Sequence, residues 1–215
     1  MCRLTTAATC ASRQIDWRVD EVTNSANFTN SSQTPSPSSS KSLPPNLPRI
    51  EIHANFAPIM TNILFICLGN ICRSCTAEEI FRTMVHKAGC DVAFHIDSAG
   101  LINYHEGELP DKRMRSHAAD HGYYLTHRSR PVTMDDFDKF DLIIAMDERN
   151  RDNLLSMAPD EAARNKVVMM ADYLQHHEGV TIIPDPYYGG AKGFELVIEL
   201  LEDACEGLLL QLTAN

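Results

Sequence analysis

The stretch CLGNICRSC, residues 67–75, concentrates side chains that can do chemistry. Its three cysteines, Cys67, Cys72 and Cys75, have the C-x4-C-x2-C spacing of a plant-type iron–sulfur loop. The same stretch places Arg73 six positions after Cys67, around a glycine, and this pattern can bind a phosphate and attack it. The two interpretations predict different proteins, so the surrounding elements must decide between them.

Two secondary-structure elements flank this stretch. Residues 63–67 form a short apolar run that predicts a buried strand. From Ala77 to Ala88 apolar residues recur at helical spacing, and Gly89 supplies a helix stop. The stretch therefore lies at the carboxyl end of a strand, where the functional crevice of a parallel α/β sheet is found.

The residue types in this connection favour a bound anion. Gly69 and Asn70 tolerate left-handed backbone, which lets successive N–H groups point inward. Ser74 is a typical N-cap, and the first amides of the helix would face the same cavity. Arg73 adds a planar fork that suits two phosphate oxygens. These features also favour the thiolate form of Cys67, which is the nucleophilic form.

A metal cluster explains the same residues less well. Cys75 would lie at the start of a helix, and a fourth ligand would have to be Cys90 or Cys205, both in positions typical of structural cysteines. A zinc site meets the same shortage of ligands. Three incidental cysteines would leave Arg73 and the glycine unexplained. We therefore predict a phosphate-binding loop with a cysteine nucleophile.

The rest of the chain predicts an α/β domain. Further strands are expected at Val92–Ile96, Asp141–Met146 and Val167–Met170. Further helices are expected at Asp111–His121, through Leu154 and Leu155, and from Phe194 to Leu208. This alternation is typical of a central parallel sheet with helices on its faces.

Composition places this domain in the later part of the chain. The 215 residues are 44% hydrophobic and 22% charged, as in a globular protein. Residues 31–48 are rich in serine and proline, a composition that cannot bury enough surface to fold. An apolar run, TNILFICL, starts directly after Met60. We expect residues 1–59 to be a disordered extension or upstream translation, and residues 60–215 to form the functional domain.

Charge and cysteine content limit the classes of protein. The net charge of −10 disfavours a general nucleic-acid-binding role. No run approaches the roughly 18 to 20 apolar residues that span a bilayer. Seven cysteines, three of them in one short segment, make a poor disulfide framework and favour a reducing compartment. We expect a cytoplasmic monomer without nucleic-acid or membrane partners.

Five stretches resemble the low-molecular-weight protein tyrosine phosphatase family, in its bacterial form. They are CLGNICRS at 67–74, DSAGL at 97–101, YHEGELPD at 104–111, FDLIIAMDERN at 140–150 and DPYYGG at 185–190. The similarity covers residues 61–210 and implies a single three-layer domain with a four-stranded parallel sheet flanked by helices. Cys75 departs from the family, which usually has proline there, at the first helical position.

The resemblance implies hydrolysis of phosphotyrosine in proteins and of small aryl phosphates. Cys67 would attack phosphorus and form a cysteinyl-phosphate, while Arg73 and the backbone amides of residues 68–73 hold the equatorial oxygens. Asp185 would protonate the phenolic oxygen and then activate water. The residues implied to bind phosphate or support the loop are Leu68, Gly69, Asn70, Ile71, Cys72, Ser74, Ser98 and His127.

Within that set, the resemblance assigns different tasks. Ser74 would hydrogen-bond the thiolate, and Asn70 would fix the loop with help from Ser98 and His127. Asp147 also matches the family, although helix capping explains it as well.

A slot for the phosphotyrosine ring would lie above the loop. Its walls would be Tyr104, Tyr187 and Tyr188, and its floor would include Leu68 and Ile71. Such a slot suits phosphotyrosine and is too deep for phosphoserine.

The nine histidines raise the question of a metal. His176 and His177 precede a glycine turn, and His117, His121 and His127 are spread over a helix and its exit. None has an acidic or cysteine neighbour at ligand spacing, and hydrolysis by a thiolate requires no metal. We predict no metal and no cofactor.

Three alternatives remain. An arsenate reductase needs two further cysteines to relay a disulfide, and Cys90 is the only one between residues 76 and 204. Arginine phosphatases of this fold have threonine at the position of Ile71. A binding module without activity would not need Cys67, Arg73 and Asp185 together. We expect phosphotyrosine proteins as substrates, with a bacterial tyrosine kinase as one candidate.

The other loop cysteines carry a separate expectation. Peroxide oxidises an accessible thiolate to a sulfenic acid. In the family, the position of Cys72 forms a protective disulfide with the nucleophile, so the resemblance implies redox regulation through Cys67 and Cys72. Cys75 would point away along the helix and take no part.

Overall fold

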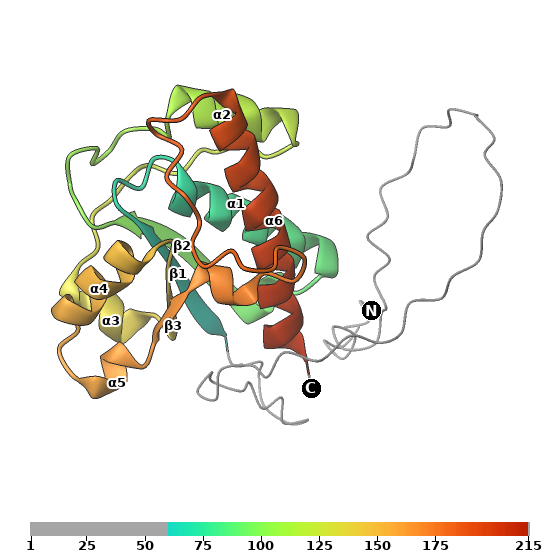
Figure 1. The fold of residues 1–215 in the computed structure, drawn as a ribbon. Helices are drawn as coiled ribbons and strands as arrows, with labels where there is room; N and C mark the ends of the chain where they lie inside the picture. Colours follow the sequence, from blue (N-terminus) through green and yellow to red (C-terminus); the bar gives the residue numbers. More distant parts are fainter. Residues whose placement is uncertain (1–59, 215) are drawn as a thin grey trace, which may run out of the picture.

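The computed structural model describes residues 60–214, so the prediction for residues 1–59 lies outside the described part. Within residues 60–214, four parallel strands form one sheet in the order β2-β1-β3-β4. Helices cover both faces, so the predicted three-layer α/β architecture is confirmed (Figure 1). None of the helices in this range is long and apolar enough to cross a membrane.

The carboxyl ends of the inner strands meet at one edge of the sheet. The strands are β1 (Thr61–Cys67), β2 (Phe94–Gly100), β3 (Leu142–Ala145) and β4 (Val167–Met169). Cys67 pairs with Gly100, and its neighbour Ile66 pairs with Ala145. The predicted second strand starts too early, because Val92 lies in a 3-10 turn, η1 (Asp91–Ala93), and is 68% exposed.

Alternate side chains of β1 enter two separate cores. Ile63 and Phe65 pack on one side, and Leu64 and Ile66 pack on the other. The first side is covered by α1 (Arg73–Ala88), α2 (Lys112–Asp120) and α6 (Ala191–Thr213). The second side is covered by α3 (Met134–Lys139), α4 (Glu148–Met157) and α5 (Glu161–Arg164). Burial on both faces explains why the β1 sequence is continuously apolar.

The two long helices follow the apolar periodicity of the sequence, and Gly89 ends α1 with a φ of 69°. The short helices α3 and α5 have no counterpart in the sequence prediction, because fewer than two turns give no readable period. Side-chain caps mark where they begin. Thr133 and Asp136 form a capping box at α3, and Asp160 accepts a hydrogen bond from a backbone amide of α5.

Close packing of α6, red in Figure 1, depends on a glycine. The backbone of the 3-10 turn η2 (Met170–Tyr173) lies against this helix. A Cβ atom at Gly207 would lie 2.0 Å from the Tyr173 carbonyl oxygen and 2.6 Å from the Gln175 Nε2 atom. The carbonyl belongs to the backbone and cannot rotate away, so a side chain at this position would force η2 and α6 apart.

We therefore expect Gly207→Ala to lower the free energy of unfolding by about 3 kcal/mol, because it overpacks a backbone contact. Chemical denaturation would measure the change. Gly193→Ala, in the same helix, is the matched control, since its Cβ would meet the nearest atoms at 3.9 Å. The control should be neutral or stabilising by up to about 1 kcal/mol. Equal effects of the two variants would contradict the close contact.

Candidate active site

The loop from residue 68 to residue 72 turns sharply at the carboxyl edge of the sheet. Asn70 has a φ of 55°, and among residues 60–214 it is the one non-glycine residue with a positive φ. Gly100, at the end of β2, allows the loop to come close. A Cβ there would lie 3.0 Å from the Leu68 carbonyl oxygen and 3.1 Å from the Asn70 nitrogen. The reversed backbone lets the Asn70 amide donate to the Cys67 sulfur at 3.3 Å.

The sulfur of Cys67 lies at the base of this loop and is only 3% exposed as a residue. It shares a hydrogen bond of 3.1 Å with the Ser74 hydroxyl, as the family resemblance implied. The prediction that Ser74 is an N-cap is wrong. Cys72 occupies the N-cap position of α1 without a side-chain cap, and Ser74 is the second residue of the helix. Its hydroxyl is therefore available to the sulfur instead of a helix amide.

The guanidinium of Arg73 is buried and held by three oxygen atoms. It donates to Asp147 at 2.5 Å, to the Ile183 carbonyl at 3.1 Å and to Asp185 at 3.0 Å. Burial by itself lowers the pKa of Arg73, but the negative charges of Cys67 and Asp185 and the hydrogen bond to Asp147 raise it above its ordinary value. Arg73 is therefore held as a cation beside the sulfur.

Asp147 has two roles that the sequence did not separate. One carboxylate oxygen caps α4 by accepting from the Asn150 amide at 2.8 Å. The other oxygen accepts from Arg73, so the same side chain fixes both a helix start and the guanidinium. The capping interpretation was correct but incomplete, because the contact with Arg73 spans 74 positions in the sequence.

Asp185, the third predicted catalytic residue, lies beside Arg73. Its side chain is 40% exposed, and besides Arg73 it accepts from the Tyr187 amide at 3.1 Å. Together these groups line a cavity of about 250 Å³. The full lining is Cys67, Leu68, Gly69, Ile71, Cys72, Arg73, Ile102, Tyr104, His105, Asp185, Tyr187 and Tyr188.

The predicted tyrosines surround the mouth of this cavity. Tyr188 is 95% exposed, Tyr104 is 80% exposed and Tyr187 is 36% exposed. Tyr187 and Tyr188 meet edge to face at 5.0 Å, and the Arg113 guanidinium lies 5.3 Å from the centre of the Tyr187 ring. His105 also lines this wall, and no sequence pattern predicted it there, although it lies inside the stretch YHEGELPD that carries part of the resemblance.

A buried polar network holds Asn70 in its left-handed conformation. The side-chain nitrogen of Asn70, Nδ2, donates to the Ser74 hydroxyl at 2.9 Å and to the Ser98 hydroxyl at 2.8 Å. The side-chain oxygen of Asn70, Oδ1, lies 3.0 Å from His127 Nε2 and accepts from the Arg130 backbone amide at 3.0 Å. Every polar group of the Asn70 side chain is thus bonded, as the predicted roles of Ser98 and His127 require.

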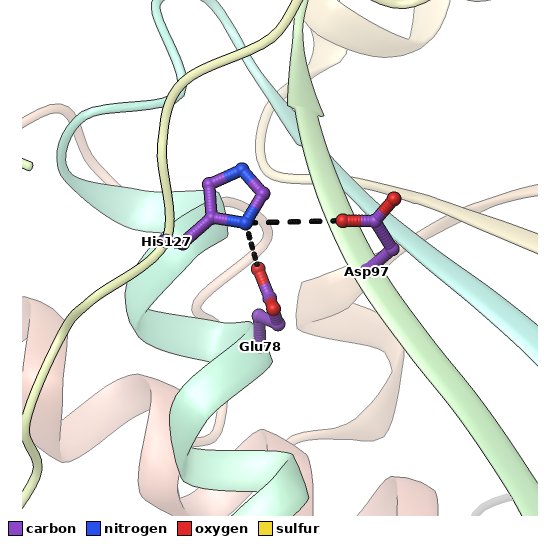
Figure 2. Close-up of side chains that lie close together, drawn as sticks. All are labelled: Glu78, Asp97 and His127. Atoms are coloured by element: carbon purple, nitrogen blue, oxygen red, sulfur yellow. Dashed lines mark ion pairs between the residues drawn. The ribbon is translucent and has the colours of Figure 1, made fainter. Parts of the chain in front are cut away.

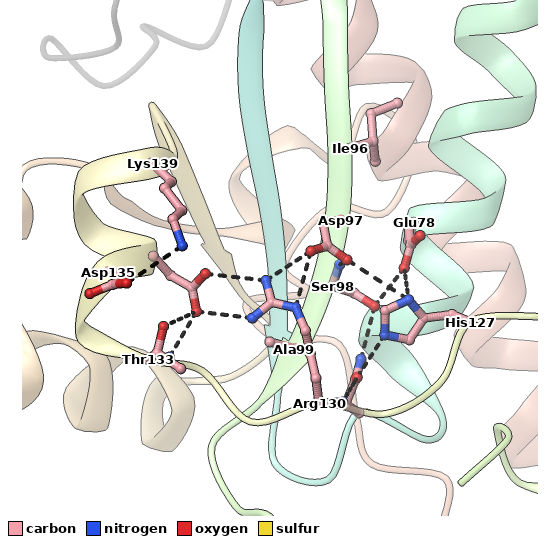
Figure 3. A network of polar contacts seen from close by, with 12 residues as sticks. Glu78, Ile96, Asp97, Ser98, Ala99, His127, Arg130, Thr133, Asp135 and Lys139 are labelled. Carbon is pink, nitrogen blue, oxygen red and sulfur yellow. Dashed lines mark hydrogen bonds and ion pairs between the residues drawn. The ribbon is translucent and has the colours of Figure 1, made fainter. Parts of the chain in front are cut away.

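Behind this network, His127 lies between two carboxylates (Figure 2). His127 Nδ1 is 3.0 Å from Glu78 and 3.8 Å from Asp97. In Figure 3, Asp97 lies between His127 and Arg130, and Arg130 in turn contacts Asp136 of α3. Ser98 also donates to Glu78, at 2.7 Å, so Glu78 supports Asn70 through both Ser98 and His127. No sequence pattern predicts a functional role for Glu78.

No acidic residue lies at ligand spacing from His127 in the sequence, but the fold brings two carboxylates beside it. Glu78, Asp97 and His127 place possible ligand atoms within 4.8 Å of one another. The two oxygens that face His127 already accept hydrogen bonds, however: Glu78 Oε2 from the Ser98 hydroxyl at 2.7 Å and Asp97 Oδ1 from the Ser98 amide at 2.8 Å. The other oxygen of each carboxylate pairs with a guanidinium, that of Arg82 or Arg130. With every oxygen of the two carboxylates already bonded, these residues fit a positioning network better than a metal site.

Other histidines also pair with acids across the fold. His117 and His121 both contact Glu195 of α6, and His177 contacts Glu199 and Asp203 of the same helix. The partners are 22 to 78 positions away in the sequence, which is why a search for nearby ligand motifs did not find them.

The remaining thiols of the described region are buried. Burial raises the pKa of Cys72, Cys75 and Cys205 far above the ordinary range. Cys75 is the third residue of α1, rather than the first, and its sulfur lies 3.4 Å from the Cys72 carbonyl oxygen. Cys205 lies against the Ala77 carbonyl in the core between α1 and α6.

A cysteine sulfur, a fixed guanidinium and an aspartate around one cavity define a class: hydrolases of phosphate monoesters with a cysteine-containing loop after the first strand. Comparison with known proteins narrows this class. Residues 62–215 match the family described as low molecular weight phosphotyrosine protein phosphatase. The chain belongs to this family.

Three individual proteins show how similar this chain is to known phosphatases. A putative low molecular weight protein-tyrosine-phosphatase of Synechocystis is 47% identical over 150 residues, which cover 70% of this chain and 95% of that protein. The crystal structure of a protein tyrosine phosphatase from Entamoeba histolytica is 44% identical, with a TM-score of 0.68, and covers 71% of this chain and 96% of that one. A Drosophila arginine phosphatase is 33% identical, with a TM-score of 0.64 over 68% of this chain and 94% of that one.

The network behind Asn70 gives a pH-dependent prediction. Burial raises the pKa of Glu78, but the hydrogen bond and charge of His127, with the bonds from Ser98 and Arg82, lower it below its ordinary value overall. The stabilisation is therefore complete above the ordinary glutamate pKa and is lost as the pH falls through the lowered value. Glu78→Gln should cost about 2 kcal/mol near neutral pH, and the gap from wild type should narrow in acid.

Thermal or chemical unfolding from neutral to acid pH would measure the difference in stability between Glu78→Gln and wild type. Glu79→Gln is the control, because Glu79 also pairs with Arg82 but does not contact the network, and burial raises its pKa instead. A Glu78→Gln protein as stable as wild type at neutral pH would show that the network does not depend on this charge.

Proposed function

We propose that this chain hydrolyses phosphotyrosine in proteins, and small aryl phosphates, through a cysteinyl-phosphate on Cys67. The observation that supports this most is the convergence of Cys67, Arg73 and Asp185 on one tyrosine-walled cavity. Cys67 ends β1, Arg73 begins α1, and Asp185 lies 112 positions after Arg73. A nucleophile, a cation for the phosphoryl oxygens and a proton donor are the parts that the reaction needs.

In the first step Cys67 attacks phosphorus in line with the phenolic oxygen. Arg73 and the amides of the loop bind the three equatorial oxygens, and the Asn70 amide supports the sulfur. Asp185 donates a proton to the phenolic oxygen as the bond to phosphorus breaks. In the second step Asp185 accepts a proton from water, which attacks the cysteinyl-phosphate and releases phosphate.

The contact between Arg73 and Asp185 prepares both groups for this sequence. In the free protein the guanidinium binds the carboxylate at 3.0 Å. A phosphate dianion that takes over the guanidinium leaves Asp185 beside a second negative charge. The carboxyl group, released from Arg73, can then act on the phenolic oxygen as the general acid.

The cavity favours an aryl phosphate over the two related activities. Ile71 lines the wall where arginine phosphatases of this fold have threonine, and an apolar side chain suits an aromatic ring better than a guanidinium. An arsenate reductase would need two further cysteines to relay a disulfide, and between residues 76 and 204 the sequence has only Cys90. We therefore place phosphoarginine and arsenate behind phosphotyrosine as substrates.

Substitution of the three central residues tests the proposal. Cys67→Ser should abolish turnover of aryl phosphates, and Arg73→Lys should lose nearly as much, because a point charge cannot replace a bidentate fork. Asp185→Ala should lower turnover by about 10² to 10⁴, the usual contribution of general acid–base catalysis. Steady-state kinetics with phosphotyrosine peptides would measure these losses, and normal turnover by Cys67→Ser would rule out the mechanism.

We also propose that Cys72 protects the nucleophile from oxidation. Peroxide would convert Cys67 to a sulfenic acid, and the Cys72 thiol would condense with it and release water. Both residues line the same cavity, whereas Cys75 does not. Peroxide should inactivate the protein, dithiothreitol should restore it, and mass mapping should find the bond between Cys67 and Cys72.

In a Cys72→Ala variant, recovery with dithiothreitol should fail, because the sulfenic acid proceeds to irreversible oxidation states. Cys75→Ala is the matched control and should recover like wild type. Recovery that persists without Cys72 but disappears when Cys75 is also replaced would assign the protective role to Cys75.

A further inference from the structure

The wall of the cavity contains a histidine that the proposed reaction does not use. His105 lies next to Tyr104, whose ring it meets edge to face at 5.0 Å. Its Nδ1 atom is 2.7 Å from a carboxylate oxygen of Glu108, and its side chain is 19% exposed. None of the hydrogen bonds within residues 60–214 involves its Nε2 atom.

The ring of His105 lies against the phosphate-binding loop. A Cβ atom at Gly69 would be 3.2 Å from the His105 Cδ2 atom and 3.9 Å from Nε2. The unbonded edge of the imidazole therefore faces the loop side of the cavity, while the bonded edge faces Glu108. A side chain at position 69 would occupy the space that this edge now fills.

The segment that carries His105 is anchored to the phosphate-binding loop on both sides. Before it, the Ile102 amide donates to the Leu68 carbonyl at 3.1 Å, and after it, the Asp111 amide donates to the Ile71 carbonyl at 2.8 Å. Within the segment, the Glu108 amide donates to the His105 carbonyl at 2.9 Å. The imidazole is thus fixed before any ligand binds, which lowers the entropy lost on binding.

The distribution of charge around the cavity indicates what His105 could bind. Among the lining residues, Arg73 and His105 are the two that can carry a positive charge. Arg73 is surrounded by Asp147 and Asp185 and is used for the phosphate. A second negative group on a substrate, next to the phosphotyrosine, would therefore find its cationic partner in His105.

We propose that His105 is a specificity-determining residue that, as an imidazolium held by Glu108, favours phosphotyrosine sites with an adjacent acidic side chain. This inference rests on the proposed phosphotyrosine specificity. Histidine is the side chain whose charge changes between about pH 5 and pH 8, so the preference is strong in mild acid and weak in mild base.

The other charged groups near His105 do not produce the same pH dependence. The nearby acidic side chains are Glu106, Glu108 and Asp185, and carboxyl groups as a class ordinarily titrate below this range. Arg113, at the rim, is paired with Asp111 and stays cationic, so it adds a preference for acidic peptides that does not change with pH. A change in preference with pH therefore reports on His105.

The test compares two phosphotyrosine peptides that differ only in the flanking residues, glutamate in one and glutamine in the other. Their dissociation constants are measured with the full-length Cys67→Ser protein at about pH 6 and about pH 8. The ratio of the two constants cancels every titration that both peptides share, including that of the phosphate. The glutamate peptide should bind about fivefold more tightly at the lower pH, the size of a favourable partly exposed ion pair. At the higher pH this advantage should fall to less than about twofold.

Three variants in the same background assign the effect. His105→Gln should give the small ratio at both pH values, and His105→Lys should restore a pH-independent preference. Glu108→Gln should weaken the preference at the lower pH, because the imidazole loses the carboxylate that holds it in the cavity wall. His86→Gln is the matched control, since His86 also pairs with a carboxylate, Asp91, but lies in the last turn of α1. It should behave like the parent protein.

Two outcomes would overturn the inference: equal binding of both peptides at about pH 6, or an unchanged ratio in His105→Gln. Turnover is measured separately, with wild-type protein and the same peptides. A wild-type protein that binds the peptides with the expected ratios but does not hydrolyse them would contradict the proposed function, and not the role of His105.

Discussion

The left-handed conformation of Asn70 is the constraint on which the site depends. A phosphate-binding loop needs its amides turned toward one point, and an L-residue pays for a φ of 55° with local strain. The protein offsets this strain by bonding every polar group of the Asn70 side chain. The bonds reach Ser74 in α1, Ser98 in β2 and His127 beyond α2, so the loop conformation is fixed by elements from much of the domain.

The sheet explains how elements so distant in sequence reach this loop. Because its strands are parallel, β1, β2 and β3 end at the same edge, and Cys67, Gly100 and Ala145 lie near one another there. Gly100 allows the loop to pack directly on the end of β2. Asp147 follows β3 and reaches Arg73, which ties the cation of the site to the start of α4. The topology thus supplies both the nucleophile and its cation.

Charge is balanced at this edge in two layers. Near the cavity, Arg73 is flanked by Asp147 and Asp185, so its positive charge has two negative partners in the free site. Deeper in the domain, His127 is flanked by Glu78 and Asp97, and those carboxylates are in turn bonded to Arg82 and Arg130. The second layer does not touch the cavity, and it acts on the reaction through the position of Asn70.

The sequence by itself determined the architecture, the loop and the candidate nucleophile, because apolar periodicity and the local pattern from Cys67 to Arg73 are encoded by neighbouring residues. It placed Ser74 wrongly as an N-cap, since the choice between a helix amide and a sulfur depends on where Cys67 ends its strand. Only the tertiary structure decided the partners of Arg73, the support from Glu78 and the place of His105 in the wall. Those contacts join residues separated by up to 112 positions, and only the packing of strands and helices brings such side chains together.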